Sequence, residues 1–200
     1  MATYNLKTPI SREEIEKLRV RDIVYVTGTI VTARDAAHRR MLEYVDKEKS
    51  LPINLEGGVI YHCGPVVKKK NNEWEVIAAG PTTSARMELY EHLVIEKLGV
   101  RIIIGKGGMG SKTAEACKKY KAVYTIFTGG AGALAANAIK RVAKVEWLDL
   151  GIPEALWVFE VENFGPLLVA IDSTGRNLIQ ETMENALKKK DEILAKLGVK

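Results

Sequence analysis

Apolar runs alternate with segments of helical periodicity along most of the chain. Short runs rich in β-branched residues predict buried strands at 23–31, 101–104 and 122–127. Apolar residues three or four positions apart line one face of a helix, and this spacing predicts amphipathic segments. Helices are predicted at 33–49, 84–98, 111–120, 131–142 and 177–197.

The remaining apolar segments are shorter and predict strands and a hairpin. Segments 57–67 and 74–79 predict two strands joined at 68–72, a polar tip that contains the turn formers Asn71 and Asn72. Further strands are predicted at 145–148, 155–161 and 167–171.

Local end signals fix two helix boundaries. Ser11 and Glu14 have the spacing of a capping box, which predicts a short helix near the N-terminus. Gly99 follows the helix predicted at 84–98 and is a candidate C-cap, because glycine adopts the left-handed conformation without steric cost.

The order of the elements predicts an α/β fold. From 74–79 to 131–142 the pattern is β-α-β-α-β-α, which favours a parallel sheet with covering helices. The two ends add further strands, so we expect more than a plain three-layer sandwich. We find no repeat and no linker, and we interpret residues 1–200 as one domain.

Composition and charge exclude several classes of protein. Of the 200 residues, 46% are hydrophobic and 28% charged, as in an ordinary globular domain. The longest apolar runs, such as 122–127 and 166–171, fall short of the roughly 20 residues that span a bilayer. The first twelve residues are polar, without the apolar region of a signal peptide, so we predict a cytoplasmic protein with no membrane contact. The net charge of +5 is spread along the chain without interleaved aromatics, and we expect no nucleic acid partner.

Three turns combine small residues with a cation or a hydroxyl at the start of a predicted helix. Helix N-termini carry free N–H groups and a positive dipole end, so each turn is a potential anion seat. Such turns collect at the carboxyl edge of a parallel sheet, where Arg34, Arg86 and Lys106 would converge on one anionic small molecule. The three turns occupy 28–38, 79–87 and 105–110.

Each turn also has a simpler interpretation. Thr82, Thr83 or Ser84 is equally well explained as an N-cap. Arg34 and Arg86, taken singly, are consistent with solvated first-turn residues. A cation in the first turn of a helix nevertheless opposes the helix dipole, and its presence in all three turns is explained by an anionic ligand.

The third turn formally fits the dinucleotide fingerprint, with glycines at 105, 107 and 110 after a strand and before a helix. The acidic residue expected at the end of the next strand is missing, because that strand ends FTGG at 127–130. It is not a Walker A loop, since Lys106 precedes most of the glycines and Ser111 does not follow Gly-Lys. A non-catalytic anion- or nucleotide-binding module therefore stays as an alternative of a different class.

Cysteines and histidines do not form a metal-binding pattern. Cys63 and Cys117 are far apart and cannot make a four-cysteine site by themselves. His62 follows a strand and has either a site role or, as we expect, a structural one, and His92 falls within a helix. We expect no metal held by this chain alone.

Four segments in series resemble the β subunit of class I fumarate hydratase. They are TARDAAH at 32–38, GPTTSARM at 80–87, GKGGM at 105–109 and FTGGAG at 127–132. The similarity runs over almost the whole chain in the family's order. The sister family, the β subunit of L(+)-tartrate dehydratase, is similar in the same segments.

The resemblance implies a swivelling β/β/α fold and an α subunit as obligate partner, in a heterodimer or heterotetramer. That subunit would carry a [4Fe-4S] cluster on three cysteines, and this chain would bind no cofactor and be inactive alone. The implied activity is reversible hydration of fumarate to (S)-malate, a tricarboxylic acid cycle reaction, with a tartrate or other hydroxy-diacid dehydratase as the alternative.

By motif match, Arg34, Arg86 and Lys106 would hold the carboxylates of a dicarboxylate substrate. Thr82 would be the candidate base near C3, or would only position the substrate. The expected supporting residues are Asp35 and His38, which would order the Arg34 turn, with Thr83, Gly105, Gly107 and Gly108.

Overall fold

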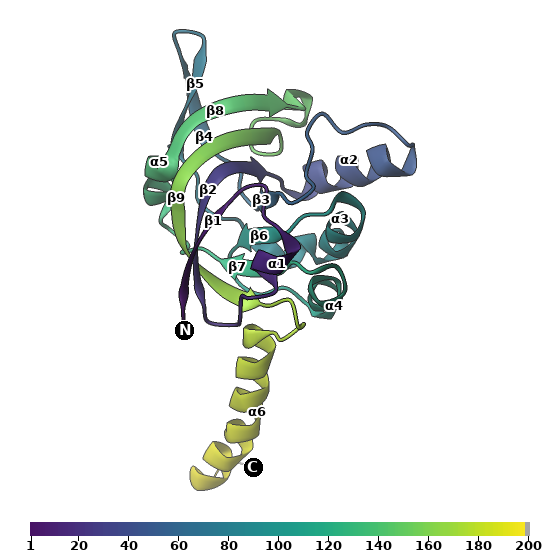
Figure 1. The fold of residues 1–200 in the computed structure, drawn as a ribbon. Coiled ribbons are helices and arrows are strands. Elements are labelled where there is room, and N and C mark those ends of the chain that lie inside the picture. Colours follow the sequence, from purple (N-terminus) through teal and green to yellow (C-terminus); the bar gives the residue numbers. More distant parts are fainter. Residues whose placement is uncertain (199–200) are drawn as a thin grey trace.

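The computed structural model describes residues 1–198, in which a seven-stranded sheet, a two-stranded hairpin and covering helices are arranged as in Figure 1. The larger sheet has the order β1-β2-β3-β6-β7-β9-β8. Its strands are β1 (Thr3–Lys7), β2 (Ile23–Thr32), β3 (Val59–Tyr61), β6 (Ile102–Gly105), β7 (Val123–Ile126), β8 (Ile139–Glu146) and β9 (Leu156–Ile171). The hairpin consists of β4 (Val66–Lys70) and β5 (Glu73–Ala78). The helices are α1 (Arg12–Ile15), α2 (Asp35–Asp46), η1 (Ser84–Leu89), α3 (Glu91–Leu98), α4 (Ser111–Tyr120), α5 (Gly132–Ala138), η2 (Leu148–Leu150) and α6 (Leu178–Lys196).

The sheet is partly parallel and closes on itself. Strands β1, β2, β3, β6 and β7 pair in parallel, whereas β8 and β9 run antiparallel to their neighbours. The long strand β9 pairs with β7 at one end and with β2 along most of its length, which joins the two sides of the sheet. This arrangement confirms the predicted α/β class with a parallel core and additional strands.

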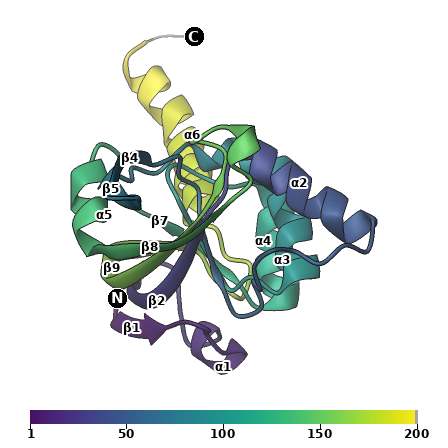
Figure 2. The ribbon, with the colours of Figure 1, turned by 90° about the horizontal axis from the view of Figure 1, so that it is seen from above.

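Two apolar clusters lie on opposite faces of the parallel strands. Side chains alternate along a strand, so Tyr61 points into the closed side of the sheet with Trp157 and Phe164. Ile60 and Ile103 point to the other face, which α2, α3 and α4 cover. Figure 2 shows these three helices together on one side of the strands. Both faces are buried, as parallel strands require.

Several elements form where local signals predict them. Helix α4 spans the predicted residues, and Ser11 and Glu14 make both hydrogen bonds of a capping box. Gly99 ends α3 in the left-handed conformation with φ of 68°. Asn71 and Asn72 turn the β4–β5 hairpin, each with positive φ.

The prediction that segment 74–79 opens the parallel core is wrong. Within residues 1–198, strand β5 (Glu73–Ala78) pairs with β4 and with no strand of the larger sheet, and β3 takes the position in that sheet. The reason lies in burial: β3 is buried on both faces, whereas residues of β5 alternate between exposed and half-buried. An alternating strand suits a partly solvated hairpin.

The helix predicted at 131–142 is also shorter than expected. Helix α5 ends at Ala138, and Ile139 begins β8. Irregular pairing with β9 between Ile139 and Arg141, and again between Val142 and Lys144, places every third residue on the inner face. Two bulges therefore imitate helical spacing in a strand. The strands predicted at 155–161 and 167–171 form one continuous strand, β9.

Helix α6 extends from the body of the molecule (Figures 1 and 2). Asn177 caps it, accepting hydrogen bonds from the N–H groups of Ile179 and Gln180. Within the described part of the chain, every helix is too short or too polar to cross a membrane.

Candidate active site

All four motif segments lie at the carboxyl ends of the parallel strands, the fourth directly after β7. The second segment reaches this edge although β5 lies outside the sheet. The N–H of Thr82 donates to the carbonyl of His62 (2.7 Å), at the end of β3, and the N–H of Ser84 donates to the carbonyl of Lys106 (3.1 Å), after β6. The segment thus lies across the ends of β3 and β6, beside the turn that leads from β2 to α2.

Arg34 stands at the start of α2, and its side chain is 23% exposed. Its Nε lies 3.2 Å from a carboxylate oxygen of Glu154. The other carboxylate oxygen of Glu154 accepts a hydrogen bond from the N–H of Ala36 (2.9 Å), in the first turn of α2. One residue of the loop before β9 therefore holds the cation and caps the helix. The local sequence around 154 gave no signal for this role.

Arg86 joins the first and second motif segments. Its Nη2 donates to Asp35 at 2.8 Å and lies 3.4 Å from the hydroxyl of Thr82. Asp35, expected to order the Arg34 turn, pairs with Arg86. A guanidinium beside a hydroxyl favours its deprotonated form, because opposite charges attract. The side chain of Arg86 is 47% exposed and therefore accessible to a ligand.

Lys106 is partly buried, and its stem runs beside the fourth motif segment. A Cβ added at Gly129 would lie 3.6 Å from Cδ of Lys106. Gly105 is tightly enclosed, since a Cβ there would lie 1.8 Å from the hydroxyl oxygen of Ser84. Gly107 adopts φ of 76°, a conformation that favours glycine.

The two remaining supporting candidates have different surroundings. Thr83 is exposed and pairs with Lys106 through a parallel backbone bridge. Gly108 packs under α6, because a Cβ there would lie 3.0 Å from the side chain of Ile179. Gly108 therefore serves close packing of the chain.

The helix N-termini at the first and third turns are not open anion seats. At α4, Glu88 accepts hydrogen bonds from the N–H of Gly110 (2.7 Å), the N–H of Thr113 (3.2 Å) and the hydroxyl of Thr113 (2.7 Å). At α2, Glu154 fills the same role. The expectation that these helix starts await an external anion is wrong, because a carboxylate of the protein already occupies each of them and accepts from the N–H of Ala36 or from those of Gly110 and Thr113. The dinucleotide interpretation of 105–110 loses its phosphate seat for the same reason.

Beneath the turns lies a buried hydrogen-bonded cluster, which we call the Glu91 network: His38, His62, Ser84 and Glu91, all fully buried. One carboxylate oxygen of Glu91 lies 2.9 Å from Nε2 of His38 and 2.7 Å from Nε2 of His62. Nδ1 of His38 lies 2.8 Å from the carbonyl of Arg34, and Nδ1 of His62 lies 2.9 Å from the hydroxyl of Ser84.

Geometry and electrostatics set the protonation of the Glu91 network. Burial raises the pKa of Glu91, but the charge of His38 and hydrogen bonds from both histidines outweigh it and lower that pKa to about 2. Burial lowers the pKa of His38, yet Glu91 raises it above the ordinary value on balance. For His62 burial prevails and the pKa is lowered. His38 is thus an imidazolium paired with an ionised Glu91, and His62 is neutral.

Sequence reasoning assigned no role to Glu91. One signal was present: Glu91 precedes Val94 and Ile95 by three and four residues, on the buried face of α3. A carboxylate at such a position needs a buried partner, because burying an unpaired charge is costly.

The residues present do not fit a [4Fe-4S] cluster. Cys63 belongs to the apolar cluster inside the closed sheet, and Cys117 to the one beneath the helices. Burial raises the pKa of both thiols, whereas cluster ligands are thiolates. We therefore assign no cluster ligand to this chain.

His38, His62 and Glu91 are residue types that bind metals, and their ligand atoms lie within 4.8 Å of one another. Ligands of a tetrahedral zinc ion at 2.0–2.2 Å are separated by about 3.3 Å. The distances from the carboxylate oxygen of Glu91 to Nε2 of His38 (2.9 Å) and of His62 (2.7 Å) are shorter than this separation and typical of hydrogen bonds. The three side chains are therefore arranged as hydrogen-bond partners of one another.

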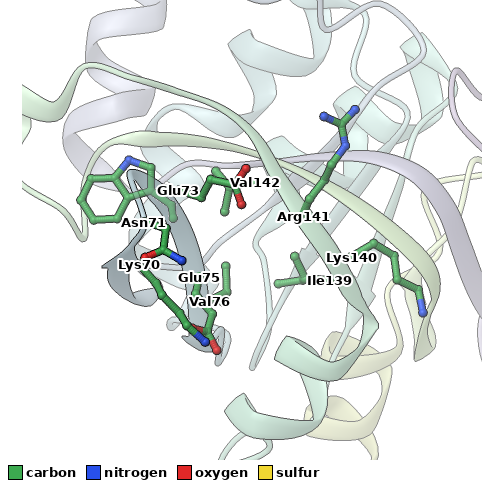
Figure 3. Close-up of a pocket in the computed structure, with 10 residues that line it drawn as sticks. Lys70, Asn71, Glu73, Glu75, Val76, Ile139, Lys140, Arg141 and Val142 are labelled. Carbon is green, nitrogen blue, oxygen red and sulfur yellow. The ribbon is translucent and has the colours of Figure 1, made fainter.

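A hollow of about 540 Å³ lies elsewhere, between the hairpin and β8. Figure 3 shows Arg141 and Lys140 directed away from Glu73 and Glu75 across it. Arg141 pairs with Glu160 on β9. None of the predicted site residues lines this hollow.

Comparison with known proteins places the chain among hydro-lyase subunits. The family described as Fumarase C-terminus matches residues 1–182. The chain is 45% identical over 192 residues to the L(+)-tartrate dehydratase subunit beta of Escherichia coli (strain K12), covering 96% of this chain and 94% of that subunit. It is 43% identical over 186 residues to the "Putative L(+)-tartrate dehydratase subunit beta" of Methanocaldococcus jannaschii, covering 92% and 95%. It is also 43% identical over 185 residues to the "Putative fumarate hydratase class I" of Geobacillus stearothermophilus, covering 92% of this chain and 35% of that protein.

Proposed function

Because the chain belongs to the Fumarase C-terminus family and is a hydro-lyase β subunit, we propose that it serves a two-subunit fumarate hydratase. The reaction is the reversible hydration of fumarate to (S)-malate. In this proposal the chain supplies substrate-binding cations and a candidate base, and an α subunit completes the site.

The observation that carries the proposal is that the turns bearing Arg34, Arg86, Lys106 and Thr82 lie at one edge of the sheet. Asp35 and Thr82 both contact Arg86, and the backbone of Lys106 contacts that of Ser84. Eliminating water from malate removes a C3 proton beside a carboxylate, which builds negative charge on that carboxylate. Fixed cations stabilise this developing charge.

Each residue then has a defined part in the reaction. Arg34 and Arg86 bind carboxylates through their guanidinium forks, and Lys106 adds a point charge. Arg34 and Arg86 are now paired with Glu154 and Asp35, which keeps both guanidinium groups in place. In its deprotonated form, which the charge of Arg86 beside it favours, the oxygen of Thr82 takes the C3 proton of malate and becomes a hydroxyl, while the bond from C2 to the departing hydroxyl breaks.

The [4Fe-4S] cluster of the proposed enzyme is assigned to the α subunit. Support comes from the two cysteines of this chain, which are buried in separate apolar clusters. The relatives named "subunit beta" imply an alpha subunit as partner. The candidate site faces that partner, and we expect this chain alone to be inactive.

The second candidate is an L(+)-tartrate dehydratase β subunit, which is favoured by the names of the relatives in Escherichia coli and Methanocaldococcus jannaschii. Tartrate carries one hydroxyl more than malate. The same cations bind its carboxylates, and the same proton removal applies.

Anaerobic co-expression with a candidate α subunit tests the proposal, with fumarate hydration and tartrate dehydration assayed in parallel. We expect fumarate turnover that requires both chains, and no turnover by either chain alone. Turnover of tartrate in place of fumarate would keep the site and change the substrate. A complex that turns over neither diacid would refute the proposed function.

A further inference from the structure

The Glu91 network reaches the backbone of each turn that holds a proposed site residue. We propose that Glu91 is a positioning residue, which holds the Arg34 turn and the Thr82–Lys106 turns in one geometry through His38 and His62. The inference rests on the proposed function for what the turns do, and on the hydrogen bonds below for how they are held.

One arm of the network ends at Arg34. The carbonyl of Arg34 only accepts hydrogen bonds, so Nδ1 of His38 donates to it at 2.8 Å. Nε2 of the same ring donates to Glu91 at 2.9 Å. His38 therefore carries both ring protons and connects α3 to the residue that bears the first cation.

The other arm ends at Thr82 and Lys106. Nε2 of His62 donates to the same oxygen of Glu91 at 2.7 Å, and its Nδ1 faces the hydroxyl of Ser84 at 2.9 Å. The carbonyl of His62 accepts from the N–H of Thr82, and the N–H of Ser84 donates to the carbonyl of Lys106. A single carboxylate oxygen is thus two hydrogen bonds from Arg34 and Thr82 and three from Lys106.

Packing gives the network little freedom to rearrange. The ring of His38 lies 5.3 Å from that of His62 and 6.4 Å from that of Tyr90, measured between centroids. A Cβ added at Gly105 would lie 3.0 Å from Nδ1 of His62. Small displacements of catalytic groups reduce rates strongly, so a rigid support of this kind matters for the reaction.

The physical cost of the network supports a functional role. Replacing a buried ion pair with apolar side chains of similar volume is often neutral or stabilising. A core that served stability alone would not require an imidazolium, a carboxylate and a second imidazole beneath the turns.

The charged and titratable groups that face His38 are Glu91 from α3, His62 after β3, Tyr90 before α3 and Asp35 on its own helix.

The first test measures the ring nitrogens of His38 and His62 in the isolated chain by 15N NMR at pH 7, with metal content determined alongside. We expect His38 protonated on both nitrogens, His62 neutral with its proton on Nε2, and no stoichiometric metal. A neutral His38, or one metal ion per chain displacing the ring protons, would overturn the proposal. This readout does not depend on turnover.

The second test uses Ser84→Ala and Glu91→Gln in the complex with the α subunit. Ser84→Ala removes only the hydroxyl at one end of the network, so it remains informative if Glu91→Gln does not fold. The matched control is Asp172→Asn. Asp172 is a buried carboxylate that accepts hydrogen bonds from Val20 and Thr174. It follows the end of β9, where Ile171 pairs with Tyr124 near the start of β7.

We expect kcat/KM to fall at least tenfold in either network variant and less than threefold in Asp172→Asn. In the isolated chain, we expect each network variant to exchange the amide hydrogens of residues 82 and 84 at least tenfold faster than wild type. The amides of β7 should keep their wild-type exchange rates. Network variants that match Asp172→Asn in kcat/KM, or that exchange faster everywhere alike, would refute positioning. If the wild-type complex turned over no diacid, the proposed function would fail while the NMR and exchange results still judged the network.

Discussion

At the scale of single residues, the candidate cations differ in how they are held. Arg34 is mostly buried and fixed by Glu154, whereas Arg86 is nearly half exposed and fixed by Asp35. Exposed ion pairs contribute little to stability, so Asp35 serves mainly to orient Arg86. A cation oriented in advance loses less entropy when it binds a carboxylate.

Arg86→Ala should therefore affect catalysis far more than folding. We expect a loss of about 3 kcal/mol of transition-state stabilisation, roughly a hundredfold in kcat/KM, as for other fixed groups that stabilise developing charge. Stability should fall by less than about 1 kcal/mol, because the lost ion pair is exposed. Steady-state kinetics of the complex and urea unfolding of the chain measure the two effects.

The control for Arg86→Ala is Arg141→Ala, which removes an exposed arginine paired with Glu160 on β9. We expect it to leave kcat/KM at the wild-type value. Equal turnover in the two variants would contradict the role given to Arg86.

At the scale of elements, the protein's own carboxylates organise the turns. Glu88 belongs to η1 and caps α4, so it ties the second motif segment to the helix that follows the third. Glu154 similarly ties the loop before β9 to α2. Negative charge at a helix N-terminus is favoured by free N–H groups and by the helix dipole.

Glu88→Ala should destabilise the chain by about 2 kcal/mol, because it leaves the N–H groups of Gly110 and Thr113 without their acceptor. Urea unfolding measures this loss. The control is Glu115→Ala, at an exposed position of α4, which should stay near wild-type stability. A Glu88 variant as stable as the Glu115 variant would show that the cap contributes nothing.

At the scale of the whole molecule, the Glu91 network makes stability depend on pH. The folded pKa of Glu91 lies below its ordinary value of 4.5, at about 2. Its contribution is therefore present above pH 4.5 and is lost as the pH falls toward 2. The lowered pKa of His62 adds a contribution that is present above pH 6.5 and lost below it. The raised pKa of His38 acts in the opposite direction, with stability that is lost as the pH rises through it.

We expect the wild-type chain to lose on the order of 3 kcal/mol of stability through Glu91 between pH 5 and pH 2, from about 1.36 kcal/mol per pKa unit. Glu91→Gln should show a flatter acid limb when urea unfolding is measured across this range. Exposed carboxylates with lowered pKa, such as Glu181 and Asp149, titrate in both proteins, so the difference reports Glu91 together with the two histidines that it contacts. Parallel acid limbs would contradict the assigned ionisation.

Features that depend on neighbours along the chain were predictable from the sequence. The helix at Ser111–Tyr120, the capping box at Ser11, the left-handed end at Gly99 and the Asn71–Asn72 turn formed as predicted. Periodicity, caps and turn residues act over a few positions, and no distant contact is needed to recognise them. The motif segments also identified the residues that gather at the edge of the sheet.

Which distant groups meet depends on the complete fold. It excluded β5 from the parallel sheet, closed the sheet through β9, and bulged β8 so that a strand carried helical spacing. It also brought Glu154 to the N–H of Ala36, 118 residues away in sequence, and Glu91 to His38, 53 residues away. Partners at such separations are set by topology and packing, which local patterns do not encode, because the free energy of a buried charge depends on what the whole fold places beside it.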